Sequence, residues 1–353
     1  MTRSPLQLAA LASAAVPGLD PVAVAVMGTA NAAPYDAAVV EDSQQRRWVV
    51  RAPTSPAGAA ELDAAAAVVT VLSRRLPIGM PVVRGTVPLP EGGRALVHQE
   101  IPGSGINLEE LGADDELTVA TGKTLAMIHN LDPGLFDSAG LESYTADEYR
   151  QRHLSDLDRA AASGRVPATL LSRWEQALEN VAIWQFAPTP VHGAIDGRHL
   201  LVEVVDEQPV IRGITGWRRA KVADPADDFA AIVRDCVPDT ATELARAYAH
   251  ARASRPDRHL LTRAQLVGEL GYVTNLFDAL AAGYPDRVRQ AMRWLEMLAD
   301  DVGGQDLVPS RSAPPRPAGA TAADVPAAGA GVPAATASSA PSPDVTRDSD
   351  PGG

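Results

Sequence analysis

Imidazole and carboxylate side chains, which can move protons and bind metal ions, gather in one short part of this 353-residue chain. The segment VHGAIDGRHLLV begins at Val191 and contains two histidines and an aspartate. A short predicted hairpin follows, then GITGW from Gly213 and ADPADDFA from Ala223. Histidine and aspartate are residue types that acid–base and metal chemistry use, so this part of the chain holds the first candidate site residues.

These segments resemble the catalytic loop and the metal segment of the antibiotic phosphotransferase family, which modifies aminoglycosides and macrolides. That family has His-Gly-Asp-Leu, an Asn four residues after the Leu, and later Ile-Asp-Trp. In this chain Ala194 replaces the catalytic Asp, His199 replaces the Asn, and Gly216 replaces the metal-binding Asp. The segment LAMIHNL (125–131) is a second match, to the family's Leu-Ala-x-Ile-His-x-Leu. The resemblance therefore implies a kinase-like scaffold in which the reacting residues are degenerate.

The three replacements remove the groups that phosphoryl transfer needs. The methyl group of Ala194 cannot accept a proton, and the loss of a general base typically costs a factor on the order of 10²–10⁴ in rate. Gly216 has no ligand for Mg²⁺, and the imidazole of His199 prefers softer ions. Asp196 is the nearest possible substitute base, although its side chain would point in a different direction.

Three interpretations remain open. The first is a pseudo-enzyme of the phosphotransferase family that binds a nucleotide, a small molecule or a protein partner with little or no phosphoryl transfer. The second is an active ATP- or GTP-dependent small-molecule phosphotransferase that uses substitute carboxylates. The third is a non-catalytic interaction protein. No cofactor is certain; ATP or GTP is possible, and Mg²⁺ is doubtful because Gly216 lacks a side chain.

Other polar residues near the loop are expected to support it. The resemblance implies that His192 anchors the loop through its ring nitrogens and that Asp228 supports the loop from below. Asp224 precedes Pro225, a pattern typical of a helix N-cap. His199 and Asp224 are nevertheless weak candidates for metal ligands.

The N-terminal part contains candidate nucleotide-binding residues. WVVRAP (48–53) resembles the Trp-Val-Leu-Arg-x-Pro of macrolide phosphotransferases. Arg51 and Glu61 could form the cation–acid pair with which kinases bind nucleotide phosphates, or could be a surface ion pair. By the same resemblance, the backbone from Gln99 to Ile101 would hold adenine.

The net charge of −13 and the pI near 5 argue against a nucleic-acid or anionic-membrane surface. Arg218, Arg219 and Lys221 form a basic run that lies on a solvated face or near the cleft, where it would attract phosphate or an acidic partner. The single cysteine, Cys236, lies in an apolar helical pattern and suits a reducing, cytoplasmic location as a buried thiol. The partner, whether small molecule or protein, is not identified.

The order of elements predicts an α+β, two-lobed, protein-kinase-like fold. We expect an N-lobe over residues 1–101, with a leading helix after Ser4, a helical C-lobe over 102–302, and a disordered Pro/Ala-rich tail over 303–353. A hinge is expected at 101–105. Helices are predicted near 57–76, 114–130, 147–163, 168–184, 225–236, 239–254, 262–282 and 285–302.

Overall fold

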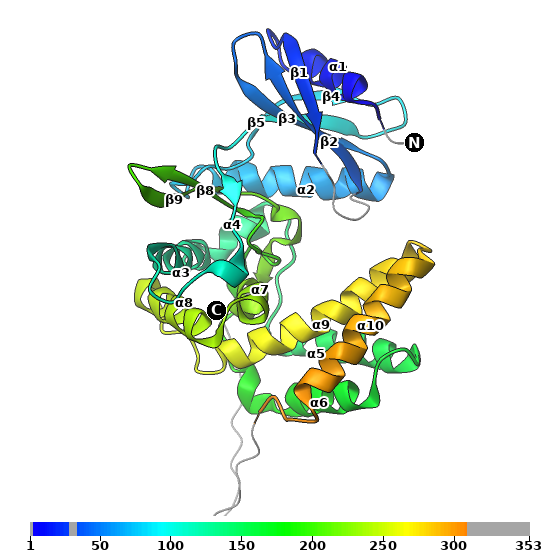
Figure 1. Cartoon of the computed structure of the whole chain (residues 1–353), viewed down its shortest axis with the longest axis vertical. Coiled ribbons are helices and arrows are strands. Elements are labelled where there is room, and N and C mark those ends of the chain that lie inside the picture. Colours follow the sequence, from blue (N-terminus) through cyan, green and yellow to red (C-terminus); the bar gives the residue numbers. More distant parts are fainter. Residues whose placement is uncertain (1–2, 28–33, 309–353) are drawn as a thin grey trace, which may run out of the picture. The chain divides into compact units, whose positions relative to one another are not determined.

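The computed structural model of the chain describes residues 3–27 and 34–308. An antiparallel sheet with helices beside it forms the N-terminal lobe, and helices form most of the C-terminal lobe (Figure 1). The predicted α+β architecture, with its small antiparallel sheet followed by a mainly helical part, is confirmed.

The sheet of the N-terminal lobe has five strands in the order β1-β2-β3-β5-β4. Alternate side chains along each strand face helix α1 (Pro5–Ala15) and form a hydrophobic core with it. Ser4 caps this helix through a capping box with Gln7. The strands are β1 (Pro21–Val26), β2 (Tyr35–Asp42), β3 (Arg47–Pro53), β4 (Val83–Pro88) and β5 (Arg94–Gln99).

Helix α2 (Pro56–Leu72) packs against both lobes. Its buried residues Val69 and Leu72 belong to the same hydrophobic cluster as Leu125 and Ile214 of the C-terminal lobe. Because burial of apolar surface is the main favourable term in folding, α2 is held against the C-terminal lobe as well as against its own sheet.

The connection between the lobes is more regular than the sequence predicts. Residues 101–105 were expected to be an irregular hinge, but their last two residues form strand β6 (Ser104–Gly105). β6 pairs with β8 (Leu200–Val205), which forms a hairpin with β9 (Gln208–Ile214). The hinge is therefore hydrogen-bonded to the hairpin that follows the degenerate loop.

A second connection, which we call the Gly79–Gly213 joint, lies beside the hinge. Gly79 donates a hydrogen bond to the carbonyl of Arg212 at 2.8 Å and accepts one from Ile214 at 3.0 Å. A Cβ on Gly79 or on Gly213 would approach a backbone carbonyl of the other segment to 2.6 Å and would also meet Ile101. Only glycine allows the two backbones to approach so closely.

The C-terminal lobe contains the predicted helices with three differences. Residues 168–184 form α6 and a separate 3-10 turn, residues 225–236 form a 3-10 turn and the short helix α7, and α4 was not predicted. The helices are α3 (Glu116–His129), α4 (Pro133–Ser138), α5 (Ala146–Ala162), α6 (Ala168–Glu179), α7 (Ala230–Asp235), α8 (Pro238–Ala251), α9 (Leu260–Ala281) and α10 (Pro285–Val302).

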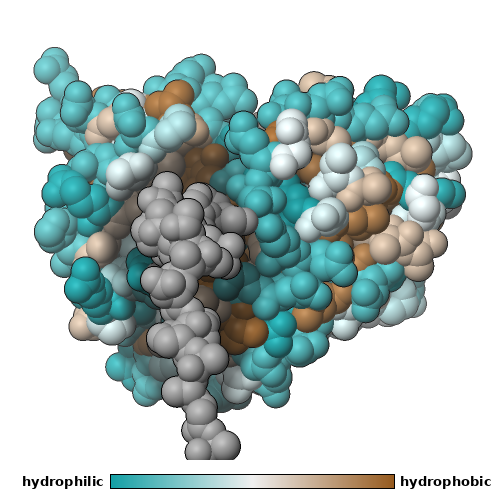
Figure 2. Space-filling view, turned by 90° about the horizontal axis from the view of Figure 1, so that it is seen from below, coloured by the Kyte–Doolittle hydropathy of each residue, from teal (hydrophilic) through white to brown (hydrophobic). Residues whose placement is uncertain are grey.

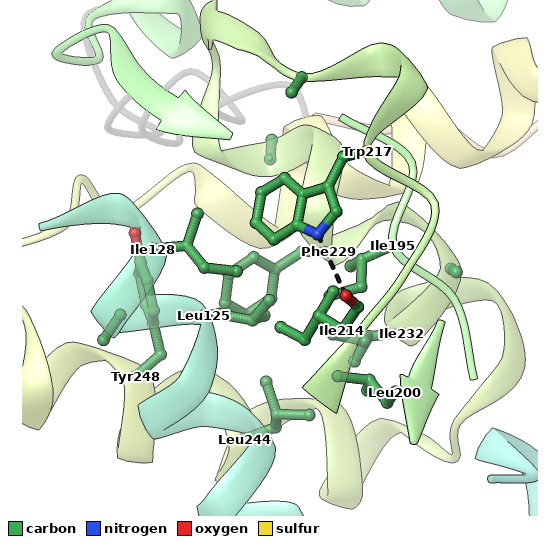
Figure 3. Close-up of a cluster of buried hydrophobic side chains, with 14 of the residues drawn as sticks. Leu125, Ile128, Ile195, Leu200, Ile214, Trp217, Phe229, Ile232, Leu244 and Tyr248 are labelled. Atoms are coloured by element: carbon green, nitrogen blue, oxygen red, sulfur yellow. Dashed lines mark hydrogen bonds between the residues drawn. The ribbon is translucent and has the colours of Figure 1, made fainter. Parts of the chain in front are cut away.

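The degenerate loop is fixed to the hydrophobic core of this lobe by its apolar residues. Figure 3 shows Ile195 and Ile214, which flank the polar residues in sequence, among the buried side chains of this core. Trp217 lies in the same cluster and donates its indole N–H to the carbonyl of Ile214 at 3.1 Å. Because the apolar residues of the motif segments are buried in this core, the positions of the polar residues next to them are fixed.

The ordered fold extends beyond the predicted end of the domain. Residues 303–308 were assigned to the tail, but Leu307 is buried in the cluster formed by α6, α9 and α10. The guanidinium of Arg173 donates to the carbonyl of Gln305 and to the carboxylate of Glu269. The rest of the predicted tail, from residue 309, lies outside the described residues.

The surface and the remaining bulk features agree with the composition. Hydrophilic residues cover most of the face shown in Figure 2, with smaller hydrophobic patches between them. Within residues 3–27 and 34–308, none of the helices has the length and hydropathy required to span a membrane.

Cys236 is buried at the end of α7, and burial raises the pKa of its thiol to about 11.

The docked segment 303–308 predicts where the chain can be truncated. A chain that ends at Val302 should be less stable than one that ends at Val308 by ~2 kcal/mol or more, because it loses the buried Leu307 side chain and the acceptor of Arg173. Urea denaturation of the two truncated chains measures the difference. Equal stability of both would show that residues 303–308 do not contribute to the fold.

Candidate functional site

The buried carboxylate of Asp228 holds the loop that contains the degenerate motif. Its two oxygens accept the backbone N–H groups of His192 at 2.8 Å and of Gly193 at 2.7 Å. Its Oδ2 also accepts the Nε2–H of His129 at 3.0 Å, whose Nδ1 accepts the hydroxyl of Tyr248. Burial raises the pKa of Asp228, but these hydrogen bonds outweigh it and hold the pKa below its usual value.

His192 ties the loop to the segment that follows the hairpin. Its ring nitrogen Nε2 lies 2.8 Å from the carbonyl oxygen of Thr215, and since a carbonyl only accepts, Nε2 carries the proton. Burial lowers the pKa of His192 to about 4, so the ring is neutral near pH 7. The ring also contacts Trp217 and His199, with centroids 4.7 and 5.2 Å away.

Ala194 replaces the base of the phosphotransferase motif, and Asp196 is the nearest possible substitute base. Ala194 offers a methyl group, and Asp196 is occupied by its own neighbours. The carboxylate of Asp196 accepts the backbone N–H of Arg198 at 2.9 Å and its guanidinium at 2.6 Å, and lies 3.1 Å from Nδ1 of His199. Burial raises the pKa of Asp196, but His199 and Arg198 together bring it well below its usual value. A carboxylate with a lowered pKa is a weaker proton acceptor.

The position of the missing metal ligand is filled by an imidazole ring. Gly216 has φ of +89°, and a Cβ built on it would meet the ring atoms of His199. The two replacements in the motif are therefore sterically linked, because the ring occupies the space that a side chain at 216 would need. Within residues 3–27 and 34–308, no group of three or more His, Cys, Asp or Glu side chains could hold a metal ion. Gly216 itself has no oxygen ligand to offer Mg²⁺.

Asp224, a weak candidate for a metal ligand, has a structural position instead. Its oxygens accept the guanidinium of Arg263 at 2.6 and 3.0 Å, and its Oδ1 also accepts the backbone N–H of Ala226 at 2.9 Å. All of these groups are buried, and burial raises the pKa of Asp224. The N-cap interpretation is confirmed, and a role of Asp224 as a metal ligand stays a prediction.

In the N-terminal lobe, Arg51 and Glu61 do not form the expected pair. Glu61 on α2 lies 3.0 Å from the guanidinium of Arg218, which follows Trp217 in the metal segment. Arg51 on β3 instead lies over the ring of Tyr35, with its guanidinium carbon 5.7 Å from the ring centroid. The prediction that these two residues pair is wrong because a cation distant in sequence takes the acid.

The backbone expected to hold adenine is connected to the sheet. The carbonyl of Gln99 accepts the Nδ1–H of His98 at 2.8 Å, and Ile101 packs into the Gly79–Gly213 joint. His98 is buried next to Arg51, and burial lowers the pKa of its ring to about 4. His98 is therefore neutral near pH 7 and adds no charge to the cleft.

A cavity of about 1000 Å³ adjoins the loop within the C-terminal lobe. Gly193 and Asp196 of the loop line it, together with residues of α5 and α9. On its wall, Asp227 accepts the hydroxyl of Tyr149 at 2.6 Å and the ammonium of Lys221 at 2.8 Å. The cavity is large enough for a small molecule.

Sequence reasoning did not single out Tyr35, His129 or Tyr149. His129 ends the LAMIH segment, so its place in the motif was a usable signal. Tyr35 and Tyr149 belong to no motif, and the partners named above, Arg51 for Tyr35 and Asp227 for Tyr149, lie 16 and 78 residues away along the chain.

Two comparisons in sequence place this chain among known proteins. A model described as "Phosphotransferase enzyme family" matches residues 33–262. An uncharacterized protein of Bacillus subtilis (strain 168), YcbJ, is 26% identical over 152 residues, which are 43% of this chain and 47% of that protein. The match thus spans about half the length of this curated relative.

Solved structures share the fold. The apoenzyme of macrolide 2'-phosphotransferase MphH from Brachybacterium faecium has a TM-score of 0.70 at 22% identity, over 82% of this chain and 97% of that chain. A macrolide 2'-phosphotransferase type I gives 0.71 at 24% identity, over 84% and 98%. The GDP complex of wild-type aminoglycoside 2'-phosphotransferase-IIIa gives 0.70 at 18% identity, over 85% and 99%. The two-lobed, kinase-like architecture is confirmed by these similarities.

The contact between residues 199 and 216 predicts a coupled mutational effect. Gly216→Asp should destabilise the protein by ~2–4 kcal/mol, from the positive φ and from overlap with the His199 ring. In a His199→Asn background the same change should be milder by at least about 1 kcal/mol. Urea denaturation of the four proteins measures the coupling.

Gly140→Asp is the matched control, because Gly140 also has a positive φ, +72°, but has open space around its Cβ. It should cost less than Gly216→Asp. Additive effects of the changes at 199 and 216 would contradict the steric link.

The neutral buried histidines predict acid sensitivity. Since the pKa values of His98 and His192 are about 4 in the folded chain and ~6.5 when unfolded, the unfolded state binds more protons between these values. Stability should therefore fall as the pH drops from about 6.5 toward 4, by up to about 3 kcal/mol for each ring. His98→Gln should lose less stability between pH 7 and pH 4.5 than the parent or the exposed control His250→Gln. Equal losses in all three would be evidence against a buried neutral His98.

Proposed function

The chain belongs to the phosphotransferase enzyme family, and we propose that it is a member that binds a nucleotide between its lobes with little or no phosphoryl transfer. The observation that carries this proposal is the imidazole of His199 at the position where a side chain of residue 216 would hold a metal ion. Charge on the transferred phosphoryl group needs a metal counterion in this class of reaction.

The absence of a base supports the same conclusion independently. The carboxylate nearest to Ala194 in sequence, Asp196, is bound by Arg198 and His199 and has a lowered pKa. Proton transfer by a positioned base typically contributes a factor of roughly 10²–10⁴. Without the Asp that Ala194 replaces and the Asp that Gly216 replaces, the frame held by Asp228 would position the loop but not the two groups that the family uses for the reaction.

Nucleotide binding is supported by the charge of the cleft. Arg51 is partly buried and has no acidic partner within residues 3–27 and 34–308, although an unpaired buried charge is costly. Arginine binds phosphate well through its planar fork. One protein of similar fold, an aminoglycoside 2'-phosphotransferase, has been solved with GDP. The adjoining cavity of about 1000 Å³ would hold a small-molecule ligand, which could be retained without transfer.

An active phosphotransferase that uses Asp196 is the second candidate, because this carboxylate lines the cavity in which a substrate hydroxyl would lie. In that case Arg198 would have to release Asp196 before it could accept a proton.

The two candidates differ in turnover. Purified protein incubated with labelled ATP or GTP and a panel of aminoglycosides, macrolides and hydroxylated metabolites should give no product above background. A thermal-shift titration with the same nucleotides should raise the melting temperature, since binding to the folded state stabilises it. Turnover of about 1 s⁻¹, as in active kinases, that disappears in Asp196→Ala would establish the second candidate. If neither nucleotide shifts the melting temperature, nucleotide binding is excluded as the function.

A further inference from the structure

Arg51 is a partly buried cation with a donor atom that is unpaired in the described part of the chain. It lies on β3, its Nε is buried, and this atom has no hydrogen-bond partner within residues 3–27 and 34–308. Burial lowers the pKa of Arg51, and the nearby guanidinium of Arg218 lowers it further. A partly buried cation beside a second cation is unfavourable unless an anion compensates both.

Arg218 approaches the same place from the C-terminal lobe. Its guanidinium carbon lies 5.9 Å from the centroid of the Tyr35 ring, over which Arg51 also lies at 5.7 Å. The only acid that pairs with Arg218 among the described residues is Glu61, at 3.0 Å. Both side chains of that pair are well exposed, at 40% and 44%, and an exposed ion pair contributes little stability. Arg218 can therefore exchange Glu61 for a more highly charged anion.

We propose that Arg51 and Arg218, which both lie near the ring of Tyr35, form a metal-independent clamp for the diphosphate group of a nucleotide, and that the bound phosphate displaces Glu61 from Arg218. This inference rests on the proposed nucleotide-binding function and specifies how it is achieved. Two planar guanidinium groups can each bind phosphate oxygens through two hydrogen bonds. These two side chains supply positive charge that a metal ion would otherwise bring. Residue 216 cannot hold such an ion, because the His199 ring fills the space that a side chain at 216 would need.

The clamp predicts that loss of the Glu61 carboxylate strengthens phosphate binding rather than weakening it. If Glu61 merely positioned Arg218 for the ligand, its removal would weaken binding. In the clamp, Glu61 competes with phosphate for the same guanidinium, so Glu61→Gln should tighten binding. The expected gain is about two- to fivefold in Kd, the equivalent of an exposed ion pair.

The test is calorimetric titration of the full chain with pyrophosphate, ADP and ATP, first in EDTA and then with Mg²⁺. Arg218→Gln should weaken binding of all three by roughly tenfold. Asp63→Asn is the matched control for Glu61→Gln, because Asp63 lies on the same helix and pairs with the exposed Arg94 at 2.9 Å. Arg94→Gln is the matched control for Arg218→Gln. Both controls should bind like the parent, since they change charge equally away from Tyr35.

Each outcome decides a different point. Unchanged or weaker binding by Glu61→Gln, or tightening of ADP or ATP binding by tenfold or more with Mg²⁺, would overturn the clamp while leaving nucleotide binding intact. Pyrophosphate binding that depends on Arg218, with no binding of either nucleotide, would support the clamp and overturn the nucleotide-binding function. Failure of all three anions to bind at millimolar concentration would overturn both.

Discussion

The carboxylate of Asp228 is the interaction on which the centre of this protein depends. It is fully buried, and it accepts two consecutive backbone amides of the loop and one imidazole N–H. A buried charge is tolerated only when such donors surround it. The donors are mainly backbone groups, so the frame does not require any particular side chain at residue 194. This separation explains how the loop keeps its geometry while its reacting groups are replaced.

The replacements at 199 and 216 have to be considered as one structural change. An imidazole at 199 requires space, and a glycine at 216 provides it. The positive φ of Gly216 further disfavours any other residue there. Near Tyr35, cationic side chains come from both lobes, Arg51 on β3 and Arg218 after Trp217, and Glu61 on α2 pairs with Arg218.

The fold could be predicted from the sequence wherever local patterns determine structure. Periodicity, turn residues and spacing predicted the hairpins, most helices and the loop motif, and the structure contains them. The pairing of Glu61 with Arg218 could not be predicted, because 157 residues separate the two and only the folded cleft brings them together. For the same reason the sequence did not indicate that His199 fills the space at Gly216 or that Leu307 enters the core. The composition instead suggested that the fold ends at residue 302.

The Gly79–Gly213 joint has a mechanical consequence. Gly79 leads from α2 toward β4 in the N-terminal lobe, whereas Gly213 lies three residues before Gly216 on β9. The backbones touch there through two hydrogen bonds, without side chains between them. The two segments cannot separate at this point unless both bonds break. Their spacing is therefore set by backbone contact, which substitution of the neighbouring side chains does not change.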